Sequence, residues 1–405
     1  MKPIKDQKKI QIASNYRTLY GKLFAALLKQ FGGQWVTQIE DAIQNAFYKS
    51  LKSWKPHQIP ENPHNWLYVV AKNDLLNQLK KEQQRTAILE KEALYFEVEE
   101  KIEEDLRLQT ILLFAQIEQV STIAKTVFIL KLIFGLSVQE ISACTLVKEA
   151  AIYKMITRTK KTFKTRFKEK TLEYSTDYSR EQLTLVEEIL YAVFNIGFDS
   201  FKEKDASIVN DDLCLESLAL SKVLYQKFKE VSTRNLMALL CFHLARVPTK
   251  VEGANLIPFF EQASSEWNAD FMKLGFYYLA QPKELDKYYI EALITSKHMT
   301  NVVCDVAYWE GIIILYQILF KITNSPIVQL NLAYCLHQAK QSERAVELLE
   351  SIETELPPKH FYFALVKADI LKGIDQGASD EIIQESIENL RQEVRIKVVS
   401  TTNQT

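Results

Sequence analysis

Glycine and proline, the residues that most often interrupt helices and strands, occur only ten times each in this chain of 405 residues. Average usage would supply roughly 28 glycines, at about 7% of residues. Folds made of strands and tight turns depend on these residues, whereas long helices exclude them. Apolar side chains instead recur at intervals of three and four, as between Leu19 and Phe31, which is the spacing of one helix face. We therefore predict an all-α fold.

The stretch that is most specific for function covers residues 134–168. Ser137 and Glu140 have the spacing of a capping box, in which each side chain bonds the backbone amide of the other residue. A short helix is expected to follow, and after a tight turn a longer helix begins at Glu149. Helix, turn and helix in this order form the helix-turn-helix pattern, whose second helix enters the major groove of DNA.

The second helix of this pattern separates into two faces on a helical wheel. One face is apolar and is expected to be buried: Ile152, Ile156, Thr159 and Phe163. The opposite face carries Lys154, Thr157, Arg158, Lys161 and Lys168, with Lys164 and Tyr153 at its margin. The candidate nucleic-acid contacts are Tyr153, Lys154, Thr157, Arg158 and Lys161. A solvated lysine face is the usual meaning of such a run. Because it coincides with a capping box and a turn, we favour phosphate contact, with Arg158 or Lys154 reaching base edges.

A second group of candidate nucleic-acid residues lies before residue 85. Thr37 and Glu40 have capping-box spacing and are expected to begin one helix, and Asn62 before Pro63 is expected to begin the next. The candidates in the second of these helices and in the loop before it are Trp66, Lys72, Lys80, Lys81, His57 and Gln58. Aromatic rings stack on unpaired bases and cations follow the backbone of a single strand. For Trp66, packing in the core is at least as good an explanation.

The near-zero net charge hides a strong asymmetry along the chain. Residues 1–170 contain 28 Lys and Arg against 18 Asp and Glu, a net charge of +10, whereas residues 171–405 contain 22 against 33, a net charge of −11. This division indicates a nucleic-acid-facing part followed by a protein-facing part. The chain is long enough for two or three domains, at roughly 100–200 residues each.

The acidic second part is expected to consist of helices from residue 181 to about residue 373. Ala333 and Ala345 are twelve positions apart, the spacing of the small residues in a tetratricopeptide hairpin. Such hairpins stack into concave surfaces that bind protein segments. Residues 86–118 are acidic and are interpreted as a linker that is helical or partly disordered.

No arrangement typical of an enzyme, a metal site or a membrane protein was found in the sequence. The five cysteines lack metal-ligand spacing and indicate free thiols in a reducing cytoplasm. The six histidines form no ligand motif, and there is no Gly-rich phosphate loop or nucleophile elbow. The longest apolar run, residues 311–320, is about half of the roughly 20 residues that a membrane span needs. We therefore expect a non-enzymatic protein without a cofactor or a membrane partner.

The two basic blocks, in this order, resemble regions two and four of sigma-70 family sigma factors of the extracytoplasmic-function (ECF) type. Residues 40–47 are similar to the region-two helix that docks on the clamp of RNA polymerase. Residues 62–67, with residues 71–73 and 80–81, are similar to the helix that engages the −10 promoter element. Residues 135–150 are similar to the region-four reader of the −35 element.

The resemblance has consequences for the organisation of the chain and for its partners. It implies region two in residues 1–85, the linker in 86–118, region four in 119–170 and a helical regulatory extension in 181–405, as in one subgroup of these factors. It implies Glu40, Asp41 and Gln44 as polymerase-binding residues and adds Asn73 to the DNA-binding set. The implied partners are promoter DNA, core RNA polymerase (the clamp of its largest subunit and the flap of the second), and a regulatory protein at the extension.

Two other functions are also consistent with the residues. The chain could be a helical-repeat interaction scaffold with a degenerate helix-turn-helix, or a DNA-binding regulator that acts without polymerase. Co-purification with core polymerase distinguishes the initiation factor from both.

Overall fold

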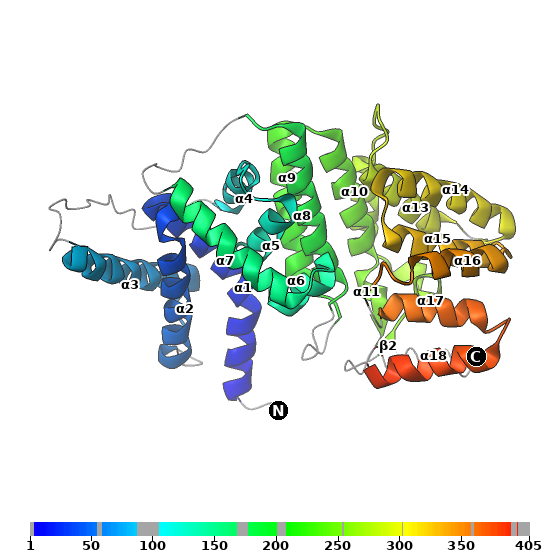
Figure 1. The fold of residues 1–405 in the computed structure, drawn as a ribbon, viewed down its shortest axis with the longest axis horizontal. Helices are drawn as coiled ribbons and strands as arrows, with labels where there is room; N and C mark the ends of the chain where they lie inside the picture. Colours follow the sequence, from blue (N-terminus) through cyan, green and yellow to red (C-terminus); the bar gives the residue numbers. More distant parts are fainter. Residues whose placement is uncertain are drawn as a thin grey trace. The chain divides into compact units, whose positions relative to one another are not determined.

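The computed structural model describes residues 4–54, 59–86, 105–167, 177–200, 208–252, 255–301, 303–357, 360–389 and 395. Across these residues the fold is all-α, as predicted: the elements are α-helices and short 3-10 helices, apart from one pair of two-residue strands. The chain divides into two compact units, Met1–Val193 and Phe194–Thr405, and each is described by itself (Figure 1).

The first unit, unit 1, contains the two basic blocks of the sequence. Its elements are α1 (Ile4–Phe31), η1 (Gly33–Trp35), α2 (Val36–Ser53), α3 (Pro63–Thr86), α4 (Arg107–Ala115), α5 (Thr122–Leu132), α6 (Val138–Thr145), α7 (Glu149–Arg166) and most of α8 (Arg180–Phe198). The helix α1 ends at Phe31 and is followed by Gly32, whose φ of +92° only glycine adopts without strain. The helices α1, α2 and α3 pack together, and α7 packs on α5, α6, η1 and α2.

Of two predicted helix starts in unit 1, one is confirmed and the other is wrong. Asn62 caps α3 as predicted, because its side-chain oxygen accepts a hydrogen bond from the backbone N–H of Asn65 (2.9 Å). The predicted capping box of Thr37 and Glu40 is wrong. The 3-10 turn η1 leads directly into α2 at Val36, so Thr37 already lies inside the helix, and no side chain caps its start. The Glu40 carboxylate forms an ion pair with Lys160 in α7 instead.

The segment interpreted as an acidic linker contains a buried helix. In α4, Leu108, Ile111 and Phe114 are at most 4% exposed, and the helix packs on α1 and α5. Arg107 at its start is also buried and forms an ion pair with Asp105 (2.8 Å). The part of the linker from residue 105 onward is therefore part of the core of unit 1. Its remainder, from residue 87 to residue 104, lies outside the described residues.

The second unit, unit 2, is a series of packed helices with one small strand pair. After the end of α8 its elements are α9 (Asp211–Phe228), α10 (Val231–Ala245), α11 (Val247–Lys250), β1 (Val251–Glu252), β2 (Asn255–Leu256), η2 (Phe259–Glu261), η3 (Ser264–Glu266), α12 (Ala269–Tyr278), α13 (Lys287–Thr300), α14 (Val306–Thr323), α15 (Pro326–Gln338), α16 (Ser342–Ile352), α17 (Phe361–Leu371) and α18 (Gln376–Asn389). The strands pair in antiparallel register. The predicted small residues Ala333 and Ala345 are both fully buried, where α15 packs on α16.

The helix α14 is long and apolar enough to cross a membrane by length and composition alone, which no other helix of the described residues is. It contains the apolar run that the sequence analysis found too short for a span. Several of its side chains, including Trp309, Ile312 and Leu319, lie in the buried core of unit 2. Only 22% of the helix is buried, and a single helix of this kind is weak evidence for a membrane span.

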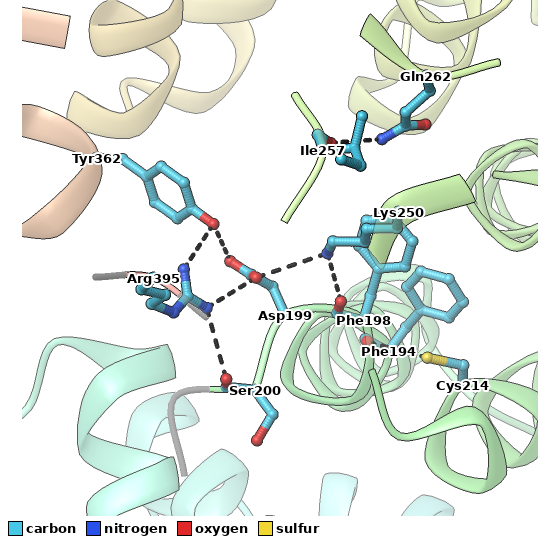
Figure 2. Close-up of polar contacts among 10 residues, drawn as sticks. All are labelled: Phe194, Phe198, Asp199, Ser200, Cys214, Lys250, Ile257, Gln262, Tyr362 and Arg395. Atoms are coloured by element: carbon cyan, nitrogen blue, oxygen red, sulfur yellow. Dashed lines mark hydrogen bonds and ion pairs between the residues drawn. The ribbon is translucent and has the colours of Figure 1, made fainter. Parts of the chain in front are cut away.

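A buried ionic network connects distant parts of unit 2 (Figure 2). Asp199, just after α8, accepts a hydrogen bond from the Arg395 guanidinium (2.8 Å) and from the Tyr362 hydroxyl, and the Lys250 ammonium lies 3.5 Å from the same carboxylate. Arg395 is fully buried. Burial raises the pKa of the Asp199 carboxyl, but the Lys250 and Arg395 charges outweigh this effect and hold it below its ordinary value. Burial lowers the pKa of Lys250 to about 8.

Candidate nucleic-acid and polymerase interface

The helix pair α6 and α7 has the local geometry that the sequence predicted. The backbone N–H of Glu140 donates to Ser137 Oγ (3.2 Å), and the N–H of Ser137 donates to Glu140 Oε2 (2.8 Å), so the capping box is confirmed. Leu146 ends α6 in the left-handed conformation, with φ of 58°. Three residues separate the two helices, and α7 begins at Glu149 as expected.

The buried face of α7 is also the predicted one. The buried residues of this helix are Ile152, Ile156, Thr159 and Phe163. The Phe163 ring contacts the rings of Phe114, Phe128 and Phe167, with centroid distances of 4.8, 6.3 and 4.5 Å. These contacts fix the rotation of α7 about its axis and therefore determine which side chains face outward.

The outward face of α7 presents the predicted nucleic-acid candidates. All five are exposed: Tyr153, Lys154, Thr157, Arg158 and Lys161. Within the described part of the chain, Lys154, Arg158 and Lys161 have no ion-pair partner, so their charges are available to an anionic ligand. The Thr157 hydroxyl donates to the Tyr153 carbonyl of its own helix (3.0 Å). Lys164 is partly buried, and Lys168 lies outside the described residues.

The candidates before residue 85 are only partly on the surface. Asn73, Lys80 and Lys81 in α3 are exposed, whereas Lys72 is buried, contrary to the expectation for a phosphate contact. The Lys72 ammonium lies over the Tyr68 ring, 5.7 Å from its centroid. Lys80 and Lys81 are therefore the two predicted α3 lysines that can reach a DNA backbone.

The aromatic candidate of this group is part of a packed pair. Trp66 is partly buried, and its ring meets that of Trp54 edge to face, with centroids 5.2 Å apart. Trp54 itself is buried. Core packing therefore accounts for much of the Trp66 surface. His57 and Gln58, the loop candidates, lie outside the described residues.

The three candidate polymerase contacts on α2 are not equivalent. Asp41 and Gln44 are exposed, one helical turn apart. Glu40 is only 6% exposed, which contradicts the expectation that it lies on a docking surface. Burial raises the pKa of the Glu40 carboxyl, and the neighbouring Lys160 ammonium only partly offsets this effect. Sequence reasoning missed Lys160, because a contact between positions 120 residues apart leaves no local pattern.

Comparisons with known proteins agree with part of the sequence interpretation. Residues 16–86 match the family Sigma-70 region 2, and residues 182–283 match a family of unknown function (DUF6596). An uncharacterised protein of Rhizobium meliloti (strain 1021) is 26% identical over 367 residues, which cover 86% of this chain and 84% of that protein. No solved structure matches. The region 2 match supports a sigma-70 family factor that acts in transcription initiation.

Proposed function

We propose that this protein is an ECF-type transcription initiation factor that binds core RNA polymerase and directs it to specific promoters. The observation that carries the proposal is the combination, in one chain, of a region 2 match with a separate cationic helix behind a capped turn. A region 2 domain implies core polymerase and promoter DNA as partners. We assign polymerase docking to Asp41 and Gln44, which α2 presents to solvent. The clamp is the expected docking site for region 2, and the flap for residues 119–170.

The solvent exposure of the candidate side chains decides which residues we assign to each promoter element. The outward face of α7 offers three cations and two hydroxyl groups for a major groove and its flanking phosphates. On α3, Asn73, Lys80 and Lys81 are the exposed candidates for the −10 element. None of these roles requires a catalytic group or a cofactor, so the proposed protein is not an enzyme, and it acts in the cytoplasm, where polymerase is found.

Co-purification with core polymerase tests the proposal. We expect the purified full-length chain to form a stable complex with core polymerase, because region 2 domains serve this purpose. A chain that binds duplex DNA but not core polymerase is instead a polymerase-independent regulator. A chain that binds neither is a helical-repeat scaffold, and the proposal is then wrong.

Arg158 is expected to read a base on the promoter. Its guanidinium is exposed on α7 and has the geometry to bond two acceptors on a purine edge. Replacement by alanine (Arg158→Ala) should weaken binding by about 1–3 kcal/mol, and the loss should be concentrated at one base position. Binding to a set of single-base promoter variants measures this effect.

Lys161 provides the matched comparison for Arg158. If Lys161 contacts a phosphate, Lys161→Ala should weaken binding to all sequences equally. It should also reduce the slope of log K against log salt concentration by about one. A uniform loss in the Arg158 variant as well would assign Arg158 to the phosphates and remove its role in base recognition.

Residues 181–405 are proposed to act as a tetratricopeptide-like regulatory extension of the initiation factor. The support is the acidic charge of this part, its packed helical hairpin of α15 and α16, and the second family match at its start. A chain that ends at Phe198 keeps α8 whole and lacks the rest. We expect its promoter output with core polymerase to change at least about two-fold; unchanged output would remove the regulatory role.

A further inference from the structure

Arg246 is a buried cation of unit 2 that has no counter-charge. It directly follows α10 and is 8% exposed. Within the described part of the chain its guanidinium forms no ion pair, and of its nitrogens only Nε donates a hydrogen bond, to Gln262 Oε1 (3.2 Å). Burial lowers the pKa of Arg246 to about 9, which still leaves it charged at neutral pH. The terminal nitrogens, which carry four of the five N–H groups, are therefore available to another acceptor.

The Asp199 carboxylate does not neutralise Arg246, because two other buried cations share it. The Lys250 ammonium and the Arg395 guanidinium lie 3.5 and 2.8 Å from the same oxygen, Asp199 Oδ1. These two charges, and not that of Arg246, hold the pKa of the Asp199 carboxyl below its ordinary value. A buried charge without a partner is costly. The positive charge of Arg246 is therefore left uncompensated in the interior of unit 2.

The Arg246 guanidinium lies against a cluster of aromatic rings. Its carbon Cζ is 3.7 Å from the centroid of the Phe259 ring in η2. The rings of Phe260 and His298 lie 5.0 and 5.5 Å from that of Phe259, centroid to centroid, and 5.2 Å from each other. Phe260 is 44% exposed. The ring cluster of Phe259, Phe260 and His298 therefore extends from the buried guanidinium to the surface.

His298 adds no charge to this cluster at neutral pH. Its ring nitrogen Nδ1 is hydrogen-bonded to the Tyr308 hydroxyl. Burial, and after it the Arg246 charge, lowers the pKa of His298 to about 4. A neutral imidazole carries one N–H, which is at Nε2 when Tyr308 donates to Nδ1. The cluster thus combines one cation, one neutral ring donor and a large aromatic surface.

Neutral groups hold the guanidinium in place. Gln262, itself buried, accepts from Arg246 Nε and from the Thr249 hydroxyl (3.3 Å) through the same oxygen. Its amide nitrogen donates to the Ile257 carbonyl (3.0 Å), which fixes the side chain (Figure 2). The position of Arg246 is therefore determined by hydrogen bonds that leave its charge free for a ligand.

We propose that Arg246 and the ring cluster bind a small organic acid, whose carboxylate pairs with the guanidinium and whose apolar or aromatic body lies against the rings. A planar guanidinium can donate two parallel hydrogen bonds to one carboxylate. Aromatic lining with a few fixed polar groups is typical of small-molecule sites. Inorganic phosphate has no apolar body and gains nothing from the rings. The inference concerns unit 2 alone and does not depend on the proposed function.

Calorimetric titration of the full-length chain with benzoate tests the site. Benzoate combines a carboxylate with an aromatic ring. Benzamide has the same shape without the charge, and inorganic phosphate has charge without the ring. We expect saturable binding of benzoate, at least about ten-fold tighter than that of benzamide or of phosphate, since each of these lacks one of the two interactions.

Substitutions identify the residues responsible. Arg246→Met removes the charge but keeps a long apolar side chain. It should weaken benzoate binding about ten-fold or more. It should not destabilise unit 2, because an uncompensated buried charge is replaced by an apolar group. Phe260→Ala, at an exposed position, should weaken benzoate binding at least about three-fold.

The matched control is Arg234→Met, the same change in the same helix α10. The Arg234 guanidinium also lies near an aromatic ring, 5.9 Å from the centroid of Tyr277, and it donates to the Tyr277 carbonyl (2.7 Å). It is not part of the ring cluster around Arg246. Benzoate should bind to this variant as it does to the wild-type chain.

Several results would overturn the site. Benzoate that gives no saturable heat, or that binds no better than benzamide, shows that no carboxylate is recognised. Phosphate that binds as tightly as benzoate shows that the rings take no part. Unchanged benzoate binding in Arg246→Met places the binding elsewhere. If Arg246→Met unfolds unit 2, the arginine is required for the core, which contradicts its role as a charge held free for a ligand.

Discussion

Charge reversal at Asp41 is expected to abolish binding to core RNA polymerase while leaving the fold intact. Asp41 is exposed on α2, between buried residues that fix the orientation of the helix. Placing a like charge against a complementary surface costs several kcal/mol, whereas the same change on open helix surface costs little. We expect Asp41→Arg to weaken the complex at least about 100-fold, measured by titration of labelled polymerase.

The control for this variant makes the same charge change on an exposed helix position of unit 2. Glu310 on α14 is exposed and has no assigned role in polymerase binding. Glu310→Arg should bind core polymerase as the wild-type chain does. If Asp41→Arg binds equally well, α2 is not the docking surface, and the assignment of Asp41 and Gln44 is wrong.

Removal of the Asp199 carboxylate is expected to have the largest effect on stability. Asp199→Ala leaves the Arg395 guanidinium fully buried and the Lys250 ammonium nearly so, without their common anion. Breaking a buried ion pair in this way typically costs about 3–5 kcal/mol. We expect a loss of that size in the free energy of unfolding of unit 2, with unit 1 unaffected. Hydrogen exchange in α17 and α10, compared with α2 and α5, measures the two units separately.

The matched variant Asp199→Asn keeps the shape of the side chain and a hydrogen-bond acceptor for Tyr362 but removes the charge. This variant should lose less free energy of unfolding in unit 2 than the alanine variant does.

The depressed pKa of Asp199 also makes the stability of unit 2 depend on pH. The stabilisation is present above the ordinary carboxyl pKa and disappears as the pH falls through the lower folded-state value. A loss below about 1 kcal/mol in Asp199→Ala would show that the network does not stabilise unit 2.

The features that the sequence predicted well are those determined by neighbours along the chain. The capping box of Ser137 and Glu140 is decided within four residues, and the buried stripe from Ile152 to Phe163 by the period of the helix. The same local logic predicted the cap at Asn62. Each of these features could be derived because the residues that create it are close in sequence.

Two of the failures involve a contact with a distant part of the chain. Thr37 and Glu40 have the spacing of a capping box, but the turn η1 and the partner Lys160 give Glu40 another role. Lys72 looked like a phosphate contact, but it is buried, and its ammonium lies over the ring of Tyr68, one turn earlier in the same helix. The acidic linker was inferred from charge, although its last third contains the apolar residues of α4, which pack on α1.

In unit 2, too, contacts between residues far apart in the sequence could not be predicted. The burial of Ala333 and Ala345 follows from their spacing, whereas the network of Asp199, Lys250 and Arg395 joins residues up to 196 positions apart. No sequence pattern marks such a network, because each charged residue alone resembles an ordinary surface residue.

Run-off transcription on genomic fragments with purified core polymerase tests the central claim most directly. We expect the full-length chain to produce discrete transcripts that core polymerase alone does not make, and Asp41→Arg to produce none. If the wild-type chain yields the same products as core polymerase alone on every fragment, the protein does not select promoters, and the assignment as an initiation factor is contradicted.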